Sequence, residues 1–373
     1  MELSKTGQRL EASVQLGKST IRFIAEQPSQ ERRTVRARLF LILDRTILAW
    51  DNFNIEDQDK RRALANYAWK NLPLEIQKSY PNLFFRHDLD IFCSLVWPEW
   101  VKVFAPSPMS GDPDIPLDFV LYPYIIKEGG TIIFAPPGRG KSFLGLIMAV
   151  CVDAGVRKLW PAKQFKVLFV NLERSMLSVK RRLGMVNRAL GLPANRPLLT
   201  LNARGRRLIT VYDALQRAVQ EQKVEMILVD SISRMGMGDL NDNEVGNSII
   251  DNLSSLCPTW VALAHTPRAD ESHVFGAVHF DAGADIEIQL LTQPQDLLLG
   301  IGLQITKKND LGPVPQEVFA LEFSRTLPEE PGRLVQIRRA EKNEFTEIES
   351  QKKQTLSEGV IEYLLANGAQ TAT

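Results

Sequence analysis

The chain has 373 residues, of which 44% are hydrophobic and 24% are charged, and its formal net charge is +1. This composition excludes collagen-like, low-complexity and wholly disordered chains, and the length predicts two globular domains. The near-neutral charge also excludes a uniformly cationic coat for nucleic acid, so any binding of a polyanion must come from local patches.

Three cysteines, Cys93, Cys151 and Cys257, lie far apart in the sequence and lack C-x-x-C spacing. This arrangement is not that of a disulfide framework or a zinc knuckle, and it predicts a reducing, cytoplasmic environment. The polar N-terminus has no apolar signal core, and the longest nearly apolar run, residues 143–156, is too short to span a bilayer. We therefore expect a cytoplasmic protein without a membrane partner.

Residues 1–104 are predicted to form a small all-helical N-terminal domain. Aromatic residues are dense toward its end, and we attribute them to core and domain contacts rather than to base stacking. The helical prediction depends on apolar residues that recur at the spacing of a helix face, namely Val35, Leu39, Ile42, Ile47 and Trp50, and then Leu64, Tyr67 and Ala68.

Residues 105–118 combine proline, glycine and short polar side chains, and we interpret them as a linker between domains. Between residues 119 and 330, short apolar strands alternate with helical periods. This pattern predicts an α/β core with a mostly parallel central sheet and helices on both faces. The expected strands are residues 131–135, 166–172, 198–202, 225–230, 260–264 and 300–306, and the expected helices are residues 141–153, 176–189, 211–222 and 243–256.

The strongest signal in the sequence is a phosphate-binding turn within residues 131–144. A β-branched strand leads into a Gly/Pro turn, which is followed by Gly-Lys-Ser and an apolar helix, as a P-loop requires. Gly138 and Gly140 allow backbone amides to converge on a β-phosphate. Lys141 is expected to reach the β- and γ-phosphates, and the Ser142 hydroxyl is expected to ligate Mg²⁺.

The turn departs from the P-loop pattern at one position, where Ala135 replaces the first glycine. That position begins the turn and does not cradle phosphate, so we expect the alanine to be tolerated. The predicted nucleotide-binding residues are Pro137, Gly138, Arg139, Gly140, Lys141, Ser142 and Phe143.

Two further apolar strands end in carboxylates, and a third ends in a histidine. Glu173 follows one strand and can orient the water that attacks a γ-phosphate, although it can also cap the next helix. Asp230 ends a second strand and has the character of a Walker B ligand to Mg²⁺, with bonding to nearby backbone amides as the alternative. His265 ends the third strand, where it can sense the γ-phosphate or have a structural role.

These residues resemble a RecA-like ATPase core, and more narrowly the hexameric helicases of the DnaB and RepA plasmid-replication type. The resemblance covers roughly residues 115–325. Besides the P-loop, it is carried by four stretches of the sequence, namely Asn171-Leu172-Glu173-Arg174-Ser175-Met176 with Arg181-Arg182-Leu183, residues 275–286, Thr306-Lys307-Lys308-Asn309-Asp310, and Phe319-Ala320-Leu321-Glu322-Phe323.

The resemblance also implies how subunits cooperate. Lys307 matches the hairpin lysine that reaches the γ-phosphate of a neighbouring subunit, and Asn309 stands where DnaB-type members have arginine, closer to RepA-type members. A hexameric ring or a filament is therefore implied. Residues 234–243 and 267–281 correspond to the loops that face the central channel, and the acidic Asp270 and Glu271 make the second loop weak for tracking DNA.

Charge is strongly polarised along the predicted core. Residues 157–207 contain thirteen Lys or Arg and one acidic residue, whereas residues 208–300 contain four basic and fourteen acidic residues. The basic segment can face nucleic-acid phosphates, or it can face the acidic surface of an adjacent subunit. A third interpretation is that folding neutralises it locally.

The preferred interpretation is a RecA-like ATPase that hydrolyses ATP with Mg²⁺ and forms a ring or filament. It would act on DNA, most readily single-stranded DNA, as a helicase of the replicative, plasmid or phage type. A rival is a nucleotide-switched adaptor in a prokaryotic mobile-element or defence complex, with a protein partner on the N-terminal domain. A third is a recombinase-like filament. Residues 331–373 are predicted to be a C-terminal extension, either a truncated winged helix or a terminal helix.

Overall fold

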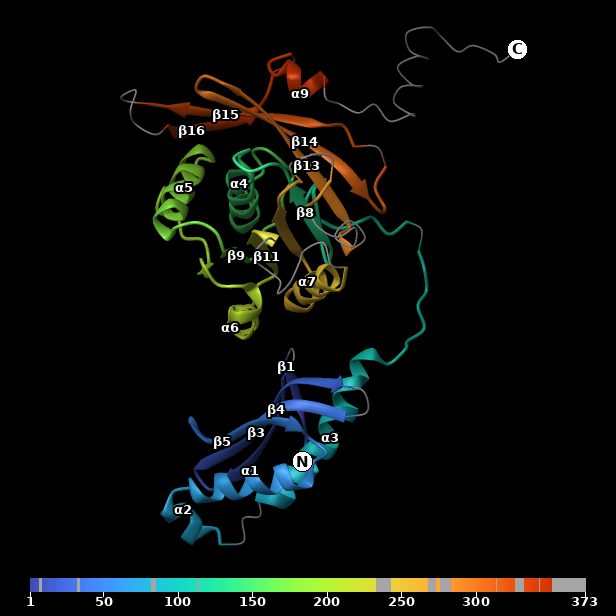
Figure 1. Ribbon diagram of the computed structural model, residues 1–373, viewed down its shortest axis with the longest axis vertical. Helices are drawn as coiled ribbons and strands as arrows, with labels where there is room; N and C mark the ends of the chain where they lie inside the picture. Colours follow the sequence, from blue (N-terminus) through green and yellow to red (C-terminus); the bar gives the residue numbers. More distant parts are fainter. Residues whose placement is uncertain are drawn as a thin grey trace, which may run out of the picture. The chain divides into compact units, whose positions relative to one another are not determined.

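The computed structural model describes the chain except for residues 7–8, 32–33, 82–84, 113, 233–242, 268–272, 276–282, 313, 326–331, 342 and 351–373. The chain divides into two compact units, Met1–Pro113 and Asp114–Thr373 (Figure 1), and the division lies inside the segment expected to be a linker. All three cysteines are buried free thiols. Among the described residues, no helix is long and apolar enough to cross a lipid bilayer.

The first unit begins with a five-stranded antiparallel meander and ends with helices. Its strands, β1 to β5, are neighbours in chain order. Helices α1 and α3 pack on one face of this sheet and complete the core of the unit (Figure 1). The elements are β1 (Ser4–Thr6), β2 (Arg9–Leu16), β3 (Ser19–Glu31), β4 (Thr34–Leu43), β5 (Thr46–Asn54), α1 (Gln58–Lys70), α2 (Leu74–Ser79), α3 (Phe85–Val101) and the short η1 (Lys102–Phe104).

The prediction of an all-helical N-terminal domain over residues 1–104 is therefore wrong for its first half. The spacing of Val35, Leu39 and Ile42 fits a helix, but β4 buries every second residue, as alternation along a strand requires. Ala37 and Leu41 belong to the same alternating series, which the helical interpretation left out. From Gln58 onward the unit is helical, as expected.

The second unit is built on a nine-stranded sheet in the order β10-β9-β11-β12-β8-β13-β14-β15-β16. The six strands from β10 to β13 are parallel and the last three are antiparallel, which confirms a mostly parallel sheet. The strands are β8 (Gly130–Phe134), β9 (Val167–Asn171), β10 (Thr200–Asn202), β11 (Met226–Asp230), β12 (Trp260–Ala264), β13 (Ile286–Gln295), β14 (Leu298–Lys308), β15 (Glu317–Ser324) and β16 (Arg333–Arg339). A separate hairpin pairs β6 (Phe119–Leu121) with β7 (Ile125–Ile126).

Helices cover both faces of the parallel strands (Figure 1). Val167 and Phe169 of β9 pack with α4 (Lys141–Ala154) and α5 (Met176–Ala189). Leu168 and Val170 of the same strand pack with α6 (Leu208–Glu221) and α7 (Asn243–Leu256). These central strands are thus buried on both faces, which explains their continuous apolar sequence.

The sheet extends beyond residue 330, the expected end of the core. Leu334 and Ile337 of β16 are buried, and β16 pairs antiparallel with β15, so residues 333–339 belong to the core and not to an extension. The short helix α9 (Thr346–Ser350) follows it. The rest of the expected C-terminal extension, residues 351–373, lies outside the described residues.

Candidate functional site

The turn between β8 and α4 lies where the parallel strands end. Gly138 and Gly140 have φ values of 82° and 83°, a left-handed conformation that strains any residue with a Cβ. Gly140 is the N-cap of α4, and no side chain of the described residues caps this helix. Backbone N–H groups at a helix start of this kind favour an anion. Pro137 and Arg139 are exposed on the same turn.

Lys141, the first residue of α4, is 7% exposed. Its Nζ donates hydrogen bonds to the carbonyl oxygens of Ala135, at 2.5 Å, and Pro136, at 2.8 Å, and lies 3.2 Å from Nδ1 of His265. Burial lowers the pKa of Lys141 to about 8, and the nearby carboxylates of Asp230 and Glu173 act in the opposite direction. The ammonium group is thus poorly compensated and suited to an anionic ligand.

Asp230 ends β11 and is 3% exposed. Burial is the main cause that raises the pKa of its carboxyl group, while a hydrogen bond from Ser142 and the charges of Arg174 and Arg182 lower it. The Ser142 hydroxyl and the Asp230 carboxylate therefore lie together next to the glycine turn. Buried oxygen ligands of this kind suit a hard divalent cation.

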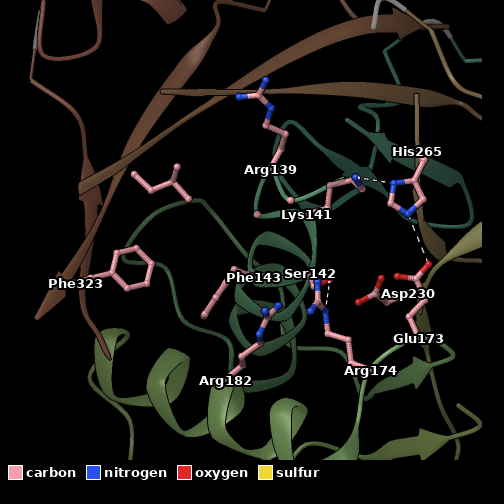
Figure 2. A pocket seen from close by; sticks show the side chains of 13 residues that line it. Arg139, Lys141, Ser142, Phe143, Glu173, Arg174, Arg182, Asp230, His265 and Phe323 are labelled. Atoms are coloured by element: carbon pink, nitrogen blue, oxygen red, sulfur yellow. Dashed lines mark hydrogen bonds and ion pairs between the residues drawn. The ribbon is translucent and has the colours of Figure 1, made fainter. Parts of the chain in front are cut away.

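Glu173, which follows β9, belongs to a hydrogen-bonded network with the ends of two other strands. Its Oε1 accepts a hydrogen bond from the Ser231 hydroxyl and lies 3.6 Å from Nε2 of His265. The same imidazole contacts Lys141 through its other nitrogen, as Figure 2 shows. His265 thus bridges the P-loop lysine and the Glu173 carboxylate.

Two arginines that the site prediction missed also line this site. Nε of Arg174 donates to Oγ of Ser142 at 3.0 Å, and the Arg182 guanidinium lies 4.5 Å from the centre of the Phe143 ring. Burial, followed by the charge of Arg174, lowers the pKa of Arg182 to about 10. Two cations held close together beside the P-loop favour an anion between them.

The backbone of Arg174 is fixed by Asn171, the last residue of β9. The side chain of this fully buried asparagine accepts a hydrogen bond from the Arg174 N–H at 2.9 Å and donates one to its carbonyl at 2.7 Å. The turn that carries both Glu173 and Arg174 is therefore locked to the sheet. The sequence carries a signal for both arginines. Arg174 directly follows Glu173 at the acidic end of a strand, and Arg182 lies on the helix that comes next.

A cavity of about 340 Å³ joins these groups (Figure 2). Arg139 points away from the two carboxylates in this view. Of the predicted site residues, Pro137 and Lys307 are not among those that line the cavity. Lys307 lies on β14, where its Nζ donates to the carbonyl of Ala284 at 2.6 Å. The lining residues are Gly138, Arg139, Gly140, Lys141, Ser142, Phe143, Glu173, Arg174, Arg182, Asp230, His265, Leu299 and Phe323.

The basic segment 157–207 does not act as a single surface. Some of its members are paired locally, as Arg196 is with Asp153 at 2.6 Å and Lys163 is with Asp118. Arg174 and Arg182 line the cavity, and the arginines of residues 204–207 are exposed in the turn before α6. Local neutralisation therefore accounts for part of the segment. Of the two loops expected to face a channel, most residues lie outside the described ranges.

Comparison with known families supports the class of site. Residues 110–268 match the family model described as AAA domain, a P-loop ATPase domain. The match includes the glycine turn, Glu173, Asp230 and His265, and it ends before Lys307. No curated protein matches the chain. The narrower resemblance to DnaB- and RepA-type helicases is carried by the sequence motifs alone.

The pKa of Lys141 predicts how nucleotide binding depends on pH. As pH rises through about 8, the ammonium loses its charge, and a phosphate chain is bound more weakly by the neutral amine. We expect the affinity for a fluorescent ATP analogue to fall above this pH, by at most about tenfold per pH unit. Lys141→Ala should bind weakly without this decline, and a parental affinity that stays constant up to about pH 9.5 contradicts the assignment.

The arginine pair is tested by Arg174→Ala and Arg182→Ala. Because a hydrogen bond to a charged group contributes about 1.5–3 kcal/mol, each substitution should raise the Kd for ATP roughly tenfold or more. Arg188→Ala is the matched control, because Arg188 is exposed and lies on α5, the helix that also carries Arg182. Equilibrium titration with the same analogue measures the effect. Affinities equal to the parent in both variants would remove the arginines from the site.

Proposed function

We propose that the chain is a RecA-like ATPase that hydrolyses ATP with Mg²⁺ and acts on DNA as a ring- or filament-forming motor. The observation that carries the proposal is a single cavity that holds the buried Lys141 ammonium, the buried Asp230 carboxylate and Glu173 beside the glycine turn. The AAA domain match over residues 110–268 supports the same class of reaction.

The residues present fit a magnesium-bound triphosphate. A Cβ placed on Gly138 would meet no atom within 4 Å, so the turn leaves open space on this side for phosphate oxygens. Ser142 and Asp230 would hold the metal, in keeping with the few protein ligands that Mg²⁺ uses beside phosphate. Bound Mg²⁺ supplies charge neutralisation at the phosphate oxygens. Lys141, Arg174 and Arg182 supply the remaining positive charge.

Glu173 is proposed as the residue that orients and deprotonates the attacking water. Its carboxylate is held by the Ser231 hydroxyl and lies next to His265, so its position is fixed before any ligand enters. Fixed placement of a general base is what makes proton transfer efficient. We propose that His265, in contact with Lys141, links the γ-phosphate to the segment that follows β12.

Assembly into a ring or filament is proposed from the resemblance to RepA- and DnaB-type helicases. Lys307 does not line the cavity of its own chain, which is the placement expected for a residue that acts on a neighbouring subunit. Single-stranded DNA is the proposed track, and the exposed arginines of residues 204–207 provide local positive charge for it or for a neighbouring subunit.

A nucleotide-switched adaptor is the second candidate. It is favoured by the separate N-terminal unit, which lies almost entirely outside the AAA domain match and has its own hydrophobic core. In this role the ATPase would gate a protein partner bound by that unit, within a mobile-element or defence complex, and would not unwind duplex DNA.

Two substitutions separate binding from hydrolysis. Glu173→Gln should bind ATP with near-parental affinity but lower kcat by about 10²- to 10⁴-fold, because the general base is removed. Lys141→Ala should bind ATP only weakly and should lose turnover. Phosphate release and analogue binding are measured in parallel with and without Mg²⁺. A Glu173→Gln variant that turns over at the parental rate would contradict the proposed role of Glu173.

The DNA-acting motor and the adaptor predict different responses to DNA. The motor should show ATPase stimulation by single-stranded DNA and should form rings or filaments with nucleotide, as seen by sedimentation and negative-stain microscopy. Lys307→Ala should leave nucleotide binding intact while reducing turnover of the assembled form. An ATPase rate that DNA does not change would support the adaptor and contradict the motor.

A further inference from the structure

The N-terminal sheet has a second face, opposite the one that α1 and α3 cover. The strand register defines it, because residues paired across an antiparallel ladder lie on the same face. Phe40 of β4 pairs with Trp50 of β5 on one side and with Ile24 of β3 on the other. Their chain neighbours Leu39 and Phe23 lie on the opposite, core side. We call the side that carries Phe40 and Trp50 the open face.

Two aromatic rings, one on β4 and one on the edge strand β5, form a stacked pair on the open face. The rings of Phe40 and Trp50 lie 6.1 Å apart with an interplanar angle of 23°. Trp50 is 59% exposed, and Ile47 beside it is 52% exposed, whereas Ile24 is only 2% exposed. Leaving so much of a tryptophan in water is unfavourable for a side chain whose burial contributes strongly to stability. The exposed ring is therefore suited to stacking with a flat ligand.

Arginines lie on the same face as this aromatic pair, on β2, β3 and β4. The same register places four arginines and three glutamates, Glu11, Glu26 and Glu31, on the open face. Glu11 pairs with Arg9 at 2.7 Å and with Arg22 at 3.6 Å, and these side chains keep about a third of their surface exposed. These pairs are half-buried, and the part of each guanidinium that stays in contact with solvent can bind a phosphate. The four arginines are Arg9, Arg22, Arg36 and Arg38.

Flat aromatic surface and guanidinium groups on one sheet face match the two parts of a nucleotide. Bases stack on the rings and phosphates bind the arginines, a combination used on sheet surfaces for single strands. A duplex does not offer its bases in this way, because they are already stacked and paired. The arginines exceed the glutamates of this face by one, and the stacked rings on the same face favour a polyanion that carries flat bases over an acidic protein surface.

We propose that the open face of the N-terminal sheet binds single-stranded nucleic acid, with Trp50 and Phe40 stacking on bases and with Arg22, Arg36 and Arg38 contacting phosphates. This inference rests on the proposed function in one respect: the proposed function has the chain act on DNA, and the inference names a surface that binds the strand. It assigns that surface to the first unit, whereas the residues that line the ATPase cavity belong to the second, so we expect binding to need neither nucleotide nor hydrolysis.

The test is fluorescence anisotropy of the full chain with labelled oligothymidylate, oligouridylate and duplex DNA, without nucleotide. The parent should bind the single strands more tightly than the duplex, and the two single-stranded probes decide between DNA and RNA. Trp50→Ala should weaken binding about 5- to 150-fold, and Trp50→Phe should restore most of it. Tyr67→Ala, a 61% exposed aromatic on α1, is the matched control and should bind like the parent.

The arginines are tested by the salt dependence of the same binding. Arg22→Ala and Arg36→Ala each remove one guanidinium from the proposed phosphate-binding set, so each should reduce the slope of log K against log salt by about 0.7. Arg62→Ala on α1, also an exposed arginine, is the control and should keep the parental slope. Melting temperatures near the parental value establish that the variants are folded.

Three results overturn the proposal in distinguishable ways. If the parent binds the strands and Trp50→Ala binds equally well, this surface is wrong while DNA binding stands. If the parent binds no single strand, the surface and the DNA-acting part of the proposed function both fail, and the ATPase assignment is untouched. If Trp50→Ala abolishes self-association and leaves oligonucleotide binding unchanged, the face is instead a contact between copies.

Discussion

The site depends on charges that are buried before any ligand is present. An isolated ammonium or carboxylate withdrawn from water costs several kcal/mol, so buried charges persist only where partners are fixed around them. Here Lys141 is held by two P-loop carbonyls, and Asp230 lies near Ser142 and the two arginines. Burial lowers the pKa of Lys141 and raises that of Asp230, which shows that these partners offset only part of the cost of burying the two charges. A triphosphate with a divalent cation would offset the rest.

The parallel sheet explains why the sequence predicts so much of the site. Glu173, Asp230 and His265 each follow an apolar strand, and parallel strands end at one edge, so three distant residues meet beside the glycine turn. Arg174 and Arg182 were missed because arginine has no fixed spacing in the P-loop pattern. Their role becomes visible only when α5 is placed beside α4. The role of Lys307 depends on a neighbouring subunit and stays a prediction.

The N-terminal unit shows where pattern analysis fails. Val35, Leu39 and Ile42 match the spacing of a helix face, although Ile42 lies on the opposite face of β4 from the other two. The full alternation along β4 identifies the strand, and it also reveals the open face. Phe40, which a helical interpretation leaves without a partner, then pairs with Trp50. In these proposals the second unit hydrolyses ATP and the first unit binds the single strand.

The most direct test of the central claim is an experimental structure with a non-hydrolysable ATP analogue and Mg²⁺. The account predicts the terminal phosphate against the Lys141 ammonium and the metal held by Ser142 and Asp230, with the Glu173 carboxylate facing the terminal phosphate. A nucleotide bound elsewhere, or a metal that contacts neither Ser142 nor Asp230, would contradict it.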